Sequence, residues 1–174
     1  MKKSERSIYL RNRLAVPSLF FWWLMFVPFM LCGQALDYSP PLDKLKVTSL
    51  FGYRIHPISG KASHHSGVDF AARSDPVFSV LDGTVKETGN HPNLGRYIRT
   101  LHGEVELIYG HLSRILVSPR DTVIAGQPIA ITGSTGRVTG EHLHFSVKFK
   151  GTFLDPLKFL HRLRELLDQP QNME

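Results

Sequence analysis

The sequence predicts a mostly β protein, with an antiparallel β-sandwich or barrel-like core and one α-helix at its C-terminal end. Short β-type runs recur at regular spacing through the body of the chain. Glycine-containing turn signals separate these runs, and no helical periodicity lies among them. One amphipathic pattern follows the last run. Together these observations favour an antiparallel sheet closed by a single helix.

Residues 1–35 have the composition of a leader. Residues 1–13 are basic and polar, and 14–31 form an uncharged, largely apolar stretch. This pattern is typical of an export signal, with residues 33–35 (Gly-Gln-Ala) as a small-x-small cleavage site. The apolar stretch also just reaches the length of an uncleaved membrane anchor, and Cys32 offers a lipid anchor as a third alternative. We expect cleavage, and each alternative exports the body to the periplasm or cell envelope.

The basic charge of the chain is concentrated in this leader. Residues 1–35 hold five basic residues and one acidic residue, a net +4. Residues 36–174 hold the other 16 basic and 14 acidic residues, a net +2. The basic excess therefore does not indicate a nucleic-acid partner. Since Cys32 is the sole cysteine, the body has no thiol for a disulfide, a zinc ligand or a nucleophile.

A short linker is expected to precede the folded body. Residues 36–43 contain Pro40-Pro41, which stiffens an extended chain. Eight strands are then expected, at 46–51, 68–71, 77–81, 84–88, 96–101, 105–112, 127–132 and 142–149. His102-Gly103 predicts a tight hairpin between two of them.

A helix is expected to close the chain. Asp155 is a favourable N-cap, and Pro156 fits the first helical position because its missing N–H needs no partner there. Four leucines recur on one face, so we expect the helix to pack on the sheet. They are Leu157, Leu160, Leu163 and Leu167.

The last expected strand carries two histidines, His142 and His144, separated by one leucine. Strand residues i and i+2 point to the same face, so both imidazoles share one space. Such a pair suits one metal ligand and one residue working beside the metal. The alternative is that both histidines are ordinary polar residues on a solvent-exposed face of the sheet.

Two further motifs supply the groups that this strand lacks. His65 and Asp69 bracket a glycine where a loop enters the strand 68–71, and His111 ends another strand. Imidazole and carboxylate ligands without thiolates suit zinc in a catalytic site, which has three protein ligands and one open position. A set of three ligands and two free bases is thus available, although His64 competes with its neighbour His65.

The three motifs together resemble the lysostaphin-type zinc endopeptidases, which are bacterial peptidoglycan hydrolases also called glycyl-glycine endopeptidases. The motifs are His65-x-Gly-x-Asp69, Tyr109-Gly110-His111 and Gly136-x-x-x-Gly140-x-His142-Leu-His144-Phe145. The resemblance covers residues 49–156 and implies a mostly antiparallel, duplicated-hybrid-motif-like peptidase core carrying its site in a groove.

The resemblance also implies the roles of the site residues. It implies one zinc ion per chain, held by His65, Asp69 and His144, and it favours His65 over His64. It implies that His111 and His142 are the catalytic pair, without deciding which of them is the general base. The remaining histidines, expected on the surface or in turns, are His56, His91, His102 and His161.

We therefore expect an exported zinc metalloendopeptidase that hydrolyses peptide bonds in peptidoglycan stem peptides or cross-bridges. Peptidoglycan peptides are the expected partner, nucleic acid is not, and any membrane contact is through an uncleaved leader. The expected division is a leader (1–35), a linker (36–43), a zinc peptidase domain (44–156), and a C-terminal helix and tail (157–174). The alternative is a non-catalytic or partner-activated regulator of wall hydrolysis on the same fold. The complete set of ligands and histidines argues against that alternative.

Overall fold

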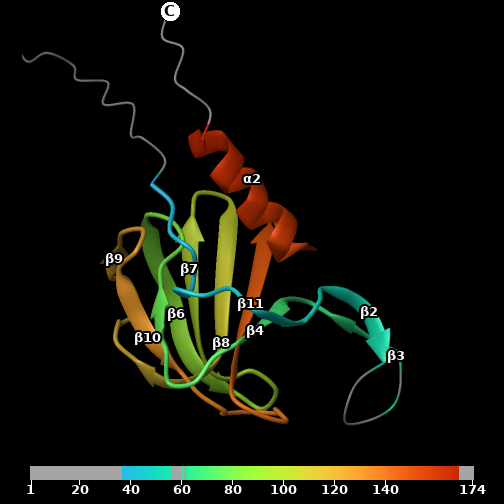
Figure 1. Ribbon diagram of the computed structural model, residues 1–174. Helices are drawn as coiled ribbons and strands as arrows, with labels where there is room; N and C mark the ends of the chain where they lie inside the picture. The colour runs from blue at the N-terminus through green and yellow to red at the C-terminus, as the bar shows by residue number, and fades with distance from the viewer. Residues whose placement is uncertain (1–36, 56–59, 61, 169–174) are drawn as a thin grey trace, which may run out of the picture. The chain divides into compact units, whose positions relative to one another are not determined.

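The structure is a computed structural model, and it describes residues 37–55, 60 and 62–168 (Figure 1). The predicted leader and His56 lie outside the described residues. The predictions made for them therefore stay predictions.

The described residues form two antiparallel sheets and one helix (Figure 1). The larger sheet runs in the order β1-β4-β11-β8-β7-β6-β9, with β10 joined to β5 and β8, and β12 joined to β11. The smaller sheet is the hairpin β2–β3. The elements are β1 (Val47–Ser49), β2 (Gly52–Ile55), β3 (Ala62–His65), β4 (Val68–Ala71), β5 (Pro76–Phe78), β6 (Gly83–His91), β7 (Gly95–His102), β8 (Val105–Ile115), β9 (Thr122–Val123), β10 (Pro128–Thr132), β11 (His142–Phe149), β12 (Thr152–Leu154) and α2 (Pro156–Asp168).

The predicted fold class is confirmed, and most expected strands are present within a few residues of their predicted bounds. The strand expected at 46–51 is shorter, since β1 covers only Val47–Ser49. The chain then bends at Phe51 and continues as β2, an unexpected strand whose first residue, Gly52, has φ of 111°. Strands β3, β9 and β12 were not predicted, because each has at most four residues and no clear apolar alternation.

Strand β8 changes partners along its length. Its first half pairs with β11 as far as Gly110, and its last residues pair with β10 from Leu112 onward. His111 lies at this change, with φ of 61°, in the left-handed region that a non-glycine residue rarely occupies. The register with β7 also shifts here, which is typical of a β-bulge that redirects a side chain.

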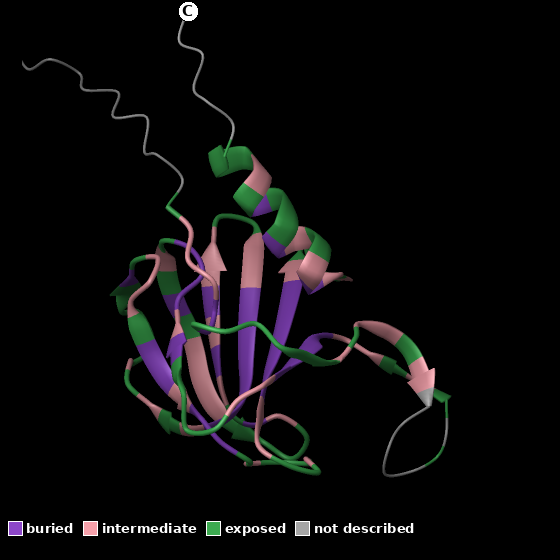
Figure 2. Ribbon diagram, in the orientation of Figure 1, coloured by how far each residue is buried: buried purple, intermediate pink, exposed green. Residues whose placement is uncertain are grey.

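The core lies on one face of the central strands β4, β11 and β8 (Figure 2). Val68, Phe70, Leu143 and Phe145 are all fully buried, and the ring of Phe145 packs on Tyr109 with centroids 5.4 Å apart. Because side chains alternate along a strand, this packing sends the residues between them to the opposite face. Those residues are the ones that build the site described below.

Residues 37–43, within the expected linker, pack against the sheet. Leu42 is only 2% exposed, and the backbone N–H of Ser39 donates to the carbonyl of Val80 at 3.0 Å. Tyr38 forms a bridge with Leu81. This segment therefore contributes to the core.

Helix α2 begins directly after the N-cap predicted from the sequence, Asp155. The Asp155 carboxylate accepts a hydrogen bond from the backbone N–H of Leu157 at 3.0 Å. Leu160 and Leu163 are buried against the sheet as expected, but Leu167 is 43% exposed, so its predicted burial is wrong. The outer end of α2 is mostly exposed (Figure 2). Among the described residues, no helix combines the length and hydropathy needed to cross a bilayer.

Candidate metal centre

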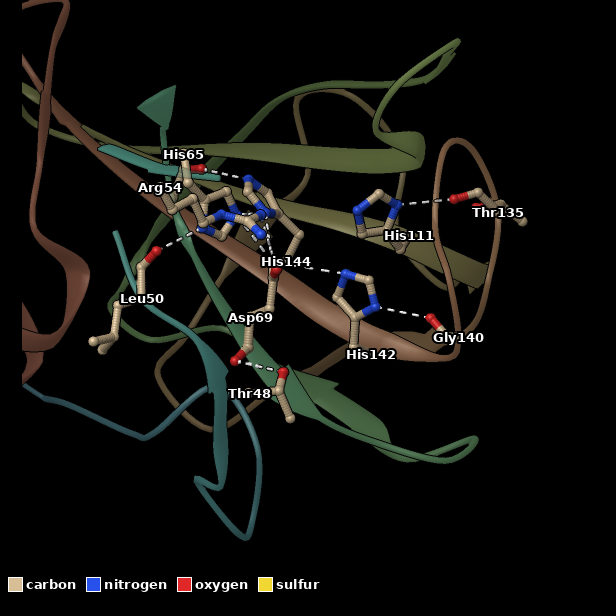
Figure 3. A network of polar contacts seen from close by, with 11 residues as sticks. Thr48, Leu50, Arg54, His65, Asp69, His111, Thr135, Gly140, His142 and His144 are labelled. Atoms are coloured by element: carbon tan, nitrogen blue, oxygen red, sulfur yellow. Dashed lines mark hydrogen bonds and ion pairs between the residues drawn. The ribbon is translucent and has the colours of Figure 1, made fainter. Parts of the chain in front are cut away.

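Asp69 and His144 face each other across neighbouring strands. The Cα partner of His144 on β4 is Asp69, and its partner on β8 is Gly110. Directly opposed residues share a face, and His142 lies on that face two positions earlier. The register of the sheet thus brings these three side chains together (Figure 3).

The β2–β3 hairpin adds His65 to this group. A Cβ at Gly67 would lie 2.6 Å from the carbonyl oxygen of Phe145 and 2.7 Å from Cε1 of His144. Only glycine therefore lets the loop between β3 and β4 pass so close to β11. This passage places the rings of His65 and His144 with their centroids 5.0 Å apart.

Three potential ligand atoms converge in the middle of the group. Nδ1 of His144 is 2.8 Å from Oδ1 of Asp69, and Nε2 of His65 is 3.2 Å from the same oxygen. The two imidazole nitrogens are 3.1 Å apart. The three side chains are only 7–11% exposed, so little water reaches them.

The hydrogen bonds on the far side of each ring direct lone pairs into this centre. Nδ1 of His65 lies 2.8 Å from the carbonyl oxygen of Leu50, which can only accept, so this nitrogen carries the proton. Nε2 of His144 lies 2.9 Å from the hydroxyl of Ser146, which can accept its proton. In these tautomers the inner nitrogens are unprotonated.

The environment also sets the charges of the group. Burial lowers the pKa of His144 and favours its neutral form. Burial acts in the opposite direction on Asp69, but contacts with His144 and His65 outweigh it and hold the pKa of Asp69 well below its usual range. The centre thus combines an ionised Asp69 carboxylate with the ring of His144, whose neutral form burial favours, and the ring of His65.

Such an arrangement fits a divalent cation. Around a tetrahedral zinc ion with bonds of about 2.0–2.1 Å, ligand atoms lie about 3.3 Å apart. The observed separations of 2.8–3.2 Å are close to this value. His65, Asp69 and His144 form the one candidate metal cluster found among the described residues, and they are the three ligands predicted from the sequence.

His111 and His142 lie beside this cluster, with ring centroids 4.6 Å apart. Nδ1 of His111 donates to the carbonyl of Thr135 at 2.9 Å, and Nδ1 of His142 donates to the carbonyl of Gly140 at 2.8 Å. Nε2 of each ring is then a free acceptor. Nε2 of His142 is 3.7 Å from Oδ1 of Asp69.

His111 is held neutral over most of the pH scale. Its side chain is directed by the bulge in β8, and the residue is 6% exposed. Burial, reinforced by the neighbouring histidines, lowers its pKa to about 4 despite the hydrogen bond to Thr135. A strained backbone and a shifted pKa at one residue are typical of functional sites.

A groove of about 610 Å³ opens over these residues. It is lined by Thr48, Ser49, Arg54, Ser63, His64, His65, Ser66, Asp69, His91, Asn93, Leu94, His111, Arg137, Val138, Thr139, His142 and His144. His91 was predicted to lie on the surface or in a turn. It does lie at a turn, where its ring accepts from the backbone N–H of Asn93, but it also lines the groove.

His64 does not join the metal cluster. Its ring packs edge-on against Phe51 and Tyr53, with centroids 5.1 Å away in both cases. Alternation along β3 turns it away from the face that carries His65.

The comparisons with known proteins agree with this geometry. The pattern of peptidase family M23 matches residues 63–156, which is more than half of the chain. The chain belongs to peptidase family M23. The predicted resemblance to lysostaphin-type metalloendopeptidases of the peptidoglycan hydrolase family is thereby confirmed.

One curated relative and two solved structures show what this M23 chain is similar to. It is 40% identical over 128 residues to the peptidoglycan DD-endopeptidase ShyA of Vibrio cholerae, covering 72% of this chain and 30% of that one. A zinc-containing peptidase from Vibrio cholerae matches with a TM-score of 0.65 at 39% identity, covering 70% and 39% of the two chains. The catalytic domain of lysostaphin from Staphylococcus simulans matches with a TM-score of 0.65 at 32% identity, covering 72% and 99%.

The M23 chain thus spans under a third of the curated relative from Vibrio cholerae but nearly all of the lysostaphin catalytic domain. The family match at residues 63–156 includes all five residues of the site, His65, Asp69, His111, His142 and His144.

Proposed function

We propose that this chain is a zinc-dependent endopeptidase that hydrolyses peptide bonds in the stem peptides or cross-bridges of peptidoglycan. The observation that supports it most directly is the convergence of three lone pairs at His65, Asp69 and His144 beside two histidines with free acceptors. His65, Asp69 and His144 would hold the metal, since neutral imidazole and carboxylate are zinc ligands.

The chemistry follows from the same atoms. When bound, zinc supplies Lewis-acid activation of a water molecule and of the scissile carbonyl. His111 and His142 act as the proton-transfer pair: an unprotonated Nε2 accepts the proton of the attacking water and returns it to the leaving amine. The backbone carbonyls of Thr135 and Gly140 keep the two rings in the tautomer that this task needs.

Peptidoglycan as substrate is supported by the names of the relatives. Several are peptidoglycan DD-endopeptidases, and the relative in Neisseria meningitidis is a DD-carboxypeptidase/endopeptidase. Family members of this kind act on the cell wall, which supports a site of action in the cell envelope or periplasm.

The composition of residues 1–35 supports export by this segment as a signal or as a membrane anchor. We propose a peptidase domain over 44–156, followed by the helix and tail at 157–174. Residues 37–43 would belong to the same folded unit, because they pack on the sheet.

Digestion of purified peptidoglycan tests the proposed function. The full-length chain, loaded with zinc in detergent, is incubated with sacculi of several cross-link types, and released peptides are identified by mass spectrometry. We expect defined cleavage products, formed far more slowly by His142→Ala. Zinc binding without cleavage of any sacculus would instead favour the non-catalytic regulator.

A further inference from the structure

Arg54 lies on the face of the β2–β3 hairpin that carries His65. In this hairpin Gly52 pairs with His65, and Arg54 pairs with Ser63. Cross-strand partners and residues two apart share a face, so Arg54 and His65 point to the same side. The guanidinium accordingly lies next to the metal centre and lines the groove (Figure 3).

Within the described part of the chain, the guanidinium of Arg54 makes few polar contacts. Nε of Arg54 is buried and has no hydrogen-bond partner among the described residues. Its ion pair with Oδ2 of Asp69 is 3.8 Å long, whereas charge-assisted hydrogen bonds are about 2.7–2.9 Å long. The side chain is 29% exposed. An arginine has up to five donors, and one that is open to the groove and weakly paired with the described residues has room for an anionic ligand.

The charge of the groove also favours an anion. Arg54 and Arg137 both line it, and Asp69 is the one carboxylate among the described lining residues. Asp69 is already engaged by His65 and His144 through Oδ1. A groove with an excess of positive charge concentrates ligands of the opposite sign. A planar guanidinium is suited to a carboxylate, which it can bind through two parallel hydrogen bonds.

We propose that Arg54 is a specificity-determining residue that binds a free carboxylate of the substrate close to the scissile bond. This proposal rests on the proposed endopeptidase function and narrows its substrate class. The preferred substrates are acidic cross-linked stem peptides, and neutral oligoglycine bridges are poor substrates. The guanidinium lies 3.8 Å from Oδ2 of Asp69, itself one of the proposed metal ligands, so the bound carboxylate belongs to a residue near the cleaved bond.

Cleavage rates on matched substrates test this proposal. The probes are cross-linked stem-peptide dimers released from peptidoglycan, with carboxyl groups either free or converted to amides by ammonia and carbodiimide. The full-length wild-type chain, Arg54→Gln and Arg54→Lys are compared with Arg162→Gln on α2, outside the groove. Zinc content is measured for each protein. kcat/KM is then determined for both forms of the dimer.

We expect the wild-type chain to prefer the free-acid dimer. Arg54→Gln should lower kcat/KM on that dimer by about 10- to 100-fold, the effect of losing a charge-assisted hydrogen bond. It should leave the amidated dimer nearly unaffected. Arg54→Lys should recover part of the preference, and Arg162→Gln should behave as wild type.

Three results would overturn the proposal. Equal wild-type rates on the two dimers would remove the carboxylate preference while leaving the endopeptidase function intact. Equal losses on both dimers in Arg54→Gln, or loss of its zinc, would make Arg54 a residue that only orients Asp69. Cleavage of neither dimer by the wild-type chain would overturn the proposed function and this proposal with it.

Discussion

Two kinds of histidine in this protein differ in what their ring nitrogens contact. At the end of β7, Nδ1 of His102 donates to the carbonyl of Asp82 at 2.7 Å, and Nε2 lies 2.7 Å from the hydroxyl of Thr100. Both nitrogens are therefore satisfied. His111 has one nitrogen bonded to a backbone carbonyl, and the other is left as an acceptor in the groove.

Burial does not separate the two kinds. It is the main cause that lowers the pKa of His102, as it is for His111. The difference lies in Nε2: in His111 and His142 it has no hydrogen-bond partner among the described residues, whereas in His102 it contacts the Thr100 hydroxyl. A histidine with a free, directed lone pair is thus the better indicator of function than a histidine with a shifted pKa.

The largest effect is expected at a histidine with a free lone pair. His142→Ala removes an acceptor beside the cluster without touching a proposed ligand. Since general acid–base catalysis contributes about 100- to 10,000-fold, kcat should fall by that amount while zinc content and the folded structure stay near wild type. Peptide release and metal analysis on the same sample check this, and full activity would remove His142 from the mechanism.

Lowering the pH should reduce the stability of the folded chain, because His111 is buried in its neutral form. Its pKa is lowered to about 4, against about 6.5 in an unfolded chain. Between these values the unfolded state binds more protons, so stability is lost as the pH falls from about 6.5 to about 4. The loss attributable to this residue is about 3 kcal/mol at most.

Denaturation in urea with a chelator, at pH 7 and pH 4, measures this loss. His111→Asn is the matched variant, because asparagine tolerates the left-handed backbone and does not titrate. The wild-type chain should lose more stability than the variant over this interval. Equal losses would mean that His111 is protonated as easily in the folded chain as in the unfolded one.

A smaller effect is expected from the residue that fixes a ligand tautomer. The hydroxyl of Ser146 lies 2.9 Å from Nε2 of His144. Ser146→Ala should weaken zinc binding by about 10- to 100-fold, as is usual when a partner of a metal ligand is removed. Ser79→Ala provides the control, since Ser79 is equally buried but bonds to the carbonyl of Leu81. Competition with a zinc chelator measures both, and equal affinities would exclude this role for Ser146.

Substitution of His102, whose two ring nitrogens both have hydrogen-bond partners, should have the smallest effect on function. His102→Gln should cost about 1–2 kcal/mol of stability through its hydrogen bonds. Zinc content and the activity per folded molecule should stay at wild-type values. A loss of either would show that the contrast between the two kinds of histidine does not hold.

Much of the site could be predicted because strand geometry determines it. The spacing of His142 and His144 fixes their common face, and alternation along β11 buries Leu143 and Phe145 behind them. The sequence therefore predicts which residues of this strand enter the core and which lie in the candidate site. The cap at Asp155 was predictable for a similar reason, since it depends only on local chemistry.

The features that were not predicted depend on distant parts of the chain. The backbone carbonyls of Leu50, Thr135 and Gly140 orient three rings, and a carbonyl has no side-chain signature. The position of Arg54 beside Asp69 depends on the β2–β3 pairing. β2 was not predicted, because Gly52 was interpreted as a turn signal and not as the first residue of a strand.

The most direct test of the account is zinc stoichiometry in a variant that keeps the shape of the centre and removes its charge. Metal-free full-length wild-type chain and Asp69→Asn are titrated with zinc in parallel, and bound metal is determined by elemental analysis. The convergence of lone pairs on Asp69, His65 and His144 predicts one zinc per wild-type chain and none retained by the variant. No zinc on the wild-type chain, or equal zinc on both, would contradict the account.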